Sequence, residues 1–222
     1  MKRIEECSFN AQDFVDHTQK SVVYATFKRP KRFSYDNPDP YGFFPGRKGD
    51  SNFYLIRWSD DLTEYTNCYA FACGWTVKDR KFNGIYQPGF LSGLEPEAMG
   101  EYVEAITKDL KAVGREVYEV YDAMTCPKKL PKAKDGSYWI KLVFAGDDRF
   151  HMLRKDENTG KWIHKAGWSN QPKVLLRFKF DEKSGSFETK YETKDTADYV
   201  GYNKAAGTFI GYKFAYAMRI QK

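Results

Sequence analysis

One of the four cysteines in this chain lies where a thiol can become a nucleophile. Cys68 follows Asn67, a residue type that caps helices, and opens an apolar run that ends before Gly74. The run is predicted to be a short buried helix with Cys68 in its first turn, where free N–H groups and the helix dipole favour a thiolate. The same N–H groups can bind an oxyanion. Cys73 would lie at the opposite end, where the dipole opposes a thiolate, so it is predicted to be a packing residue.

Two of the three histidines can supply a base and a group that orients it. His151 and His164 are 13 residues apart, in segments 149–155 and 161–165 that are predicted as strands joined by a turn at 158–160. Side chains on two such strands can share one face. A thiol, an imidazole and an orienting group are the parts of nucleophilic catalysis. His17 has no such context and is predicted to be structural.

In this order, the motifs resemble those of the NlpC-type papain-like cysteine peptidases. That family carries Asp-Cys-Ser-Gly at a helix start, a His that begins a downstream strand, and a second His about a dozen residues later. The matching segments here are Asn67-Cys68-Tyr69-Ala70-Phe71, His151-Met152-Leu153 and Trp162-Ile163-His164-Lys165-Ala166. The resemblance covers about residues 60–167. It implies that Cys68 is the nucleophile, His151 the base and His164 the residue that orients the base.

The departures from the family pattern indicate a divergent member. Tyr69-Ala70 replaces Ser-Gly, Leu153 replaces a Gly, and 83 residues separate Cys68 from His151, a gap longer than usual for the family. A helix over 96–113 and a lysine-rich loop absorb the extra length.

Other polar residues near the motifs are weaker candidates for the site. Tyr65 and Asn67 can add an oxyanion donor, although capping alone explains Asn67. Asp148, with its neighbour Asp147, precedes His151 and can orient the histidine or a substrate amine; a solvated turn is the favoured alternative. The sequence has no Cys-x-x-Cys knuckle, so neither a metal nor another cofactor is expected.

The elements that must position these residues are helical in the middle of the chain and mostly extended after it. This order predicts an α+β fold: a single papain-like domain over 1–222, with the catalytic cysteine at a helix N-terminus packed on an antiparallel sheet. We expect an N-terminal extension at 1–50, the motifs within 60–167, and additional strands in 172–222.

Composition excludes several classes of protein. Of the 222 residues, 41% are hydrophobic and 17% aromatic, enough for a core, so intrinsic disorder is excluded as the main state. Four irregularly spaced cysteines do not make a disulfide scaffold. No apolar stretch reaches 18 residues and no signal peptide is apparent. We expect synthesis in the cytoplasm, and any delivery beyond it by a virus or a secretion system.

The expected activity is hydrolysis of an amide bond in a peptide, a protein or the stem peptide of peptidoglycan, through a thioester acyl-enzyme. An acyltransferase or deamidase with the same residues remains an alternative. So do a virion structural protein and a non-catalytic module that binds protein or nucleic acid. The net charge of +6 permits an anionic partner. The lysine clusters at 28–32 and 128–134 lack interleaved aromatics, so nucleic acid is not favoured, and no membrane partner is expected.

Overall fold

The computed structural model of the chain describes residues 11–18, 23–28, 52–58, 60–79, 86–146, 149–167, 172–181, 186–191, 193–203 and 208–222. In these ranges the fold is mixed α+β, as expected. A 3₁₀ turn at Ala11–Asp13 comes first, and the helices are α1 (Asp60–Thr63), α2 (Cys68–Cys73) and α3 (Met99–Ala112).

Most of the described strands form one antiparallel sheet of seven. Its order is β12-β13-β6-β7-β8-β9, and β5 also pairs with β13. These strands are β5 (Val117–Asp122), β6 (Ser137–Ala145), β7 (Arg149–Lys155), β8 (Trp162–His164), β9 (Lys173–Val174), β12 (Tyr199–Asn203) and β13 (Thr208–Gln221). The predicted strands at 137–145 and 149–155 agree with β6 and β7.

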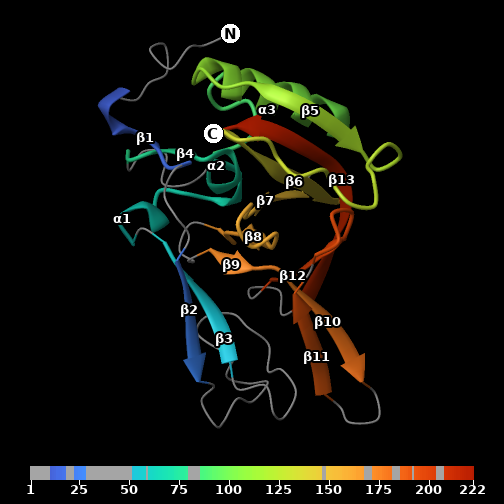
Figure 1. Ribbon diagram of the computed structural model, residues 1–222. Helices are drawn as coiled ribbons and strands as arrows, with labels where there is room; N and C mark the ends of the chain where they lie inside the picture. The colour runs from blue at the N-terminus through green and yellow to red at the C-terminus, as the bar shows by residue number, and fades with distance from the viewer. Residues whose placement is uncertain are drawn as a thin grey trace.

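Three two-stranded antiparallel pairs complete the described fold. They are β1 (Phe14–Asp16) with β4 (Trp75–Val77), β2 (Val23–Lys28) with β3 (Asn52–Arg57), and β10 (Leu176–Asp181) with β11 (Ser186–Tyr191). The pairs β2–β3 and β10–β11 extend from one end of the molecule, while α3 and β5 lie at the other (Figure 1).

Strand β13 is integral to the sheet rather than an addition to it. One of its edges pairs with β6 along most of its length, and the other pairs with β12 and then with β5. Residues 208–221 therefore hold together strands that are far apart in sequence. The strands β12 and β13, in the segment where additional strands were predicted, therefore belong to the same sheet as β6, β7 and β8.

Both faces of the sheet are buried. Helices α2 and α3 cover one face through a first cluster that includes Tyr69, Trp75, Tyr102, Ile106, Leu110, Ile140, Leu142, Met152 and Met218. The opposite face carries a second cluster that includes Leu130, Trp139, Val143, Leu153, Trp162 and Ala217. Strand β6 contributes alternate residues to both clusters, which is why its pattern is almost continuously buried.

Helix α3 begins at Met99, three residues later than predicted from Pro96. The Glu101 carboxylate accepts the backbone N–H groups of Glu97 and Ala98, at 2.8 and 3.2 Å, so the preceding residues form the helix entrance. The short strands β4 and β12 were not predicted. No helix in the described ranges is both long enough and apolar enough to cross a membrane.

Candidate functional site

Helix α2 forms as the sequence predicts. The Asn67 side chain accepts the backbone N–H of Ala70 at 3.0 Å, and Gly74 ends the helix in the left-handed conformation with φ 77°. Asn67 Nδ2 also donates to the Tyr86 carbonyl at 2.6 Å. Asn67 thus has the capping role that the sequence predicts, and its nitrogen ties the loop at Tyr86; its role as an oxyanion donor stays a prediction.

The C-terminal end of α2 is buried, and side chains satisfy its free carbonyls. The Tyr138 hydroxyl donates to the Ala72 carbonyl at 3.0 Å, and Arg115 Nη1 donates to that of Cys73 at 2.6 Å. At Gly74, a Cβ would approach Thr18 Cγ2 to 2.4 Å, so only glycine fits there. The helix is thus bound at both ends, and the position of Cys68 at its start is fixed.

A buried carboxylate joins α2 to the rest of the helical layer. Asp109 of α3 accepts the Tyr69 hydroxyl at 2.6 Å and the backbone N–H groups of Gly89 and Ser92 at 2.8 and 2.7 Å. These bonds hold the loop around Gly89 against α3.

His151 and His164 form the pair that was predicted from their spacing. His151 Nε2 and His164 Nδ1 are 3.0 Å apart, and each residue is 7% exposed. The rings meet edge to face at 82°. The antiparallel turn between β7 and β8 places both side chains on the face of the second cluster, because His164 pairs with Leu153, a member of that cluster.

Cys68 lies beside the strand that carries His151. Strand β8 pairs with β7 only from Leu153 onward, so His151 and Met152 lie beyond its end. Helix α2 packs against β7, and the Met152 backbone forms a hydrogen bond with the Cys68 thiol. The thiol is therefore bonded to the residue that follows His151 in the chain.

The electrostatics of the site differ from the expectation of a resting thiolate. Burial raises the pKa of the Cys68 thiol to about 11, against the opposing effect of nearby backbone N–H groups and Lys165. Burial also lowers the pKa of His151 to about 4. The short helix contributes too little stabilisation to offset desolvation of the thiolate. At neutral pH the resting pair is therefore an uncharged thiol and an uncharged imidazole.

Lys165 is a residue of the site that the sequence motifs did not indicate. Its side chain is fully buried, and Nζ donates to the Gly167 carbonyl at 2.8 Å. Burial lowers the pKa of Lys165 to about 7, while its charge interacts favourably with Cys68. Its position directly after His164 was the one available signal.

Two tyrosines from the C-terminal strands also belong to the site. The ring of Tyr199 on β12 stacks on His151 with 4.7 Å between centroids, and lies 5.0 Å from that of His164. Tyr212 on β13 lies 6.0 Å from His151. Nothing in the local sequence of either tyrosine indicates this position, because it results from the pairing of β12 with β13.

The remaining predicted residues lie away from this arrangement or outside the described ranges. The Tyr65 N–H donates to the Leu62 carbonyl at 3.2 Å, and its own carbonyl accepts the Thr76 hydroxyl at 2.7 Å. A contact of Tyr65 with substrate remains a prediction. Asp148 and its neighbour Asp147 fall outside the described residues.

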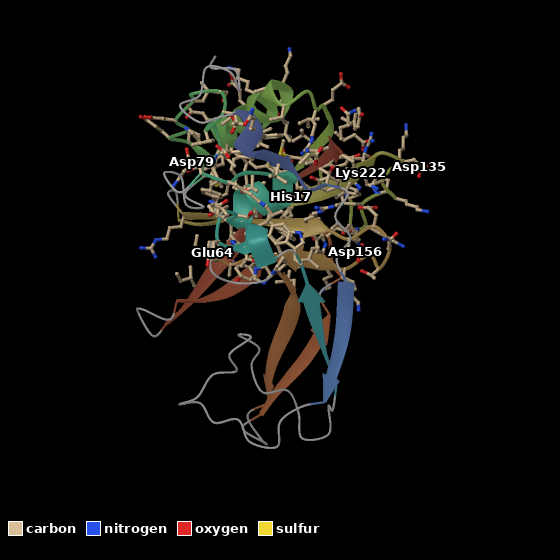
Figure 2. All side chains as sticks on the ribbon, turned by 90° about the vertical axis from the view of Figure 1, so that its left-hand side faces the viewer. His17, Glu64, Asp79, Asp135, Asp156 and Lys222 are labelled. Atoms are coloured by element: carbon tan, nitrogen blue, oxygen red, sulfur yellow. The ribbon has the colours of Figure 1, made fainter. Side chains whose placement is uncertain are left out.

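His17 is buried apart from the site, beside the short helices (Figure 2). Its ring meets Trp58 edge to face at 5.1 Å, and neither ring nitrogen has a hydrogen-bonding partner among the described residues. Burial, followed by the charge of Arg154, lowers the pKa of His17 to about 3.

Within the described part of the chain, no group of three or more His, Cys, Asp or Glu residues is arranged to hold a metal ion. The arrangement at Cys68 instead provides a thiol, a neutral base and a second imidazole that can accept a hydrogen bond from that base.

Comparison with known proteins adds no family to this geometry. No family model matches the sequence, and neither a curated protein nor a solved structure matches the chain.

Proposed function

We propose that this chain is a papain-like cysteine hydrolase, similar to the NlpC-type peptidases, that cleaves an amide bond of a peptide or of a peptidoglycan stem peptide. The observation that carries the proposal is the His151–His164 hydrogen bond of 3.0 Å. The thiol of Cys68, at the start of α2, forms a hydrogen bond with the backbone of Met152, the residue after His151. A thiol, a buried base and an orienting group on separate elements are the minimum needed for acyl transfer.

The proposed mechanism requires one direction of the hydrogen bond between the two histidines. If Nε2–H donates to His164 Nδ1, then Nδ1 of His151 is left unprotonated and can accept the thiol proton. His164 then carries its own proton on Nε2. When His151 becomes an imidazolium, its Nε2–H still donates to His164, which stabilises the charge where it develops.

The reaction then proceeds in two balanced steps. As Cys68 Sγ attacks the amide carbonyl carbon, its proton passes to His151. The C–N bond breaks, and the amine leaves with that proton, giving a thioester on Cys68. His151 next takes a proton from water, which attacks the thioester, and the carboxylic acid leaves as the thiol is restored. Backbone N–H groups at the start of α2 are suited to bind the oxyanion of both intermediates.

The test combines a substrate panel with variants of the three residues. Peptides and isolated stem peptides are incubated with the protein, and products are identified by mass spectrometry. We expect hydrolysis that Cys68→Ala abolishes and that His151→Ala slows by about 10²–10⁴-fold. Cys126→Ser is the matched control and should retain full activity, since this half-buried thiol lies outside the site.

His164 provides the sharpest variant. An Asn side chain can accept the His151 hydrogen bond through its amide oxygen, so His164→Asn should retain more activity than His164→Leu. Hydrolysis that persists in Cys68→Ala would overturn the proposal. Product mass separates the alternatives of the same chemistry, because a transferase adds the acyl group to an acceptor amine, whereas a deamidase converts an amide side chain to an acid.

A further inference from the structure

The histidine pair is covered by a single aromatic ring that comes from outside the motif region. Tyr199 stacks on His151 at 4.7 Å with only 22° between the ring planes, and its centroid is 5.0 Å from that of His164. One ring thus stacks on His151 and contacts His164 at a tilt of 59°. Its register partner Tyr212 lies alongside, at 5.4 Å between centroids.

The turn before Tyr199 is held by buried polar contacts. Asp195 is 1% exposed, and its carboxylate accepts the Leu130 N–H at 2.7 Å, Lys155 Nζ at 2.6 Å and Trp162 Nε1 at 3.2 Å. These donors come from the loop before β6 and from the two strands that carry the histidines. A carboxylate with three donors makes the position of this turn well determined.

A second anchor lies on the other side of the turn. The Asp198 carboxylate accepts the Phe214 N–H and Lys213 Nζ, both at 2.9 Å, which ties the residue before Tyr199 to β13. Lys141 Nζ also donates to the Lys194 carbonyl at 3.2 Å. The segment before Tyr199 is therefore held at Asp195 and Asp198, and the segment after it is held by the pairing of β12 with β13.

We propose that Tyr199 is a positioning residue for the histidine pair: its ring fixes the plane of the His151 imidazole and keeps water from the His151–His164 hydrogen bond. A hydrogen bond shielded from water is stronger and better aligned than an exposed one. The phenol oxygen is not needed for this role, because the contact is made by the ring. The inference rests on the proposed function only in that His151 is taken to be the base.

The variants separate the ring from its hydroxyl. Tyr199→Phe keeps the stacked ring, and Tyr199→Leu removes it. Tyr121→Leu is the matched control, because Tyr121 stacks on Trp139 at 5.7 Å against the same cluster without contacting a histidine in any described ring contact.

The first readout is the titration of His151, followed by NMR on histidine-labelled protein, in which three histidines give few signals to assign. Among the described residues, the rings of His164, Tyr199 and Tyr212 lie against its ring, and the ionisable side chains of Cys68 and Lys165 belong to the same site. The pKa of His151 should stay near 4 in wild type, Tyr199→Phe and Tyr121→Leu. In Tyr199→Leu the pKa should move up toward the ordinary value of 6.5 as water reaches the imidazole.

The second readout is amide hydrolysis. Tyr199→Leu should reduce kcat by about 10–10²-fold with little change in KM, because a misaligned base affects the chemical step. Tyr199→Phe should stay within about twofold of wild type. A His151 titration that Tyr199→Leu leaves unchanged would overturn the inference, whatever its activity.

Two further outcomes keep this test separate from that of the proposed function. If Tyr199→Leu does not fold, the NMR spectrum of the wild type still tests the inference. The carbon-bound ring protons of His151 must show the upfield chemical shift caused by a stacked ring, and the absence of that shift would overturn the inference. If the titration moves as expected but the wild type hydrolyses no substrate, the proposed function fails while the positioning role stands.

Discussion

Cys68 should behave as a half-buried neutral thiol at rest rather than as a thiolate paired with an imidazolium. Its pKa is raised to about 11, whereas an ordinary cysteine titrates near 9.0. At pH 7 the thiolate fraction is then about 10⁻⁴ instead of about 10⁻². A more basic thiolate is also a better nucleophile, which recovers about tenfold of the difference. The net expectation is alkylation about tenfold slower than that of an unfolded cysteine at pH 7.

The assay is iodoacetamide alkylation from pH 6 to 10, quenched at intervals and read at the Cys68 peptide by mass spectrometry. The rate should rise about tenfold per pH unit above pH 8, since the thiolate remains the minor form, and less steeply near pH 7, where Lys165 loses its charge. The same chain in urea is the internal reference, because there its thiols titrate as ordinary cysteines. Circular dichroism at each pH verifies that the protein stays folded.

Lys165→Met sharpens this prediction. The ammonium of Lys165 favours the Cys68 thiolate, but its own pKa is only about 7. Its removal should therefore slow alkylation at pH 6, by up to about tenfold, and leave the rate at pH 9 almost unchanged. A wild-type rate that is flat between pH 6 and 8 and exceeds that of the unfolded chain would refute the reasoning, because it would require an ion pair at rest.

Three other predictions concern the scaffold. Replacing His17 by Phe should raise the free energy of unfolding by about 1–3 kcal/mol at pH 7, because two unpartnered buried nitrogens are removed. The pKa of His17 in the folded protein, about 3, lies below the ordinary 6.5, so the free energy of unfolding of the wild type falls as pH drops from 6.5 toward 3. His17→Phe should lessen this pH dependence in urea titrations. An unchanged pH dependence would contradict the lowered pKa of His17. Asp109→Ala should cost about 2–4 kcal/mol by leaving three buried donors unpaired, whereas a cost below 1 kcal/mol in urea unfolding would show that water replaces the carboxylate. Asn67→Ala should cost about 1–2 kcal/mol, and Asn67→Asp, which keeps the cap, should cost less in thermal unfolding; equal losses would assign the effect to the bond with Tyr86 instead.

The features that the sequence predicted depend on residues close together in the chain. Asn67 and Gly74 set the two ends of α2, and both are observed in these roles. The spacing of His151 and His164 across a short turn placed their side chains on one face, where they meet at 3.0 Å. Caps, turns and strand alternation act within a few residues, so a single sequence expresses them directly.

Tertiary structure alone decided which chemical state these residues adopt. The dipole of α2 favours a thiolate at Cys68, but the packing of α2 against β7 buries the thiol and raises its pKa instead. Desolvation depends on every segment that covers a group, and those segments come from all parts of the chain. Tyr199 covers the histidines because β12 pairs with β13 and β13 with β6, and no local signal reports such pairings. The sequence thus determined that Cys68 begins a helix and that the two histidines share one face of a strand pair. Long-range packing determined the protonation states of these residues, their exposure to water and the side chains that contact them.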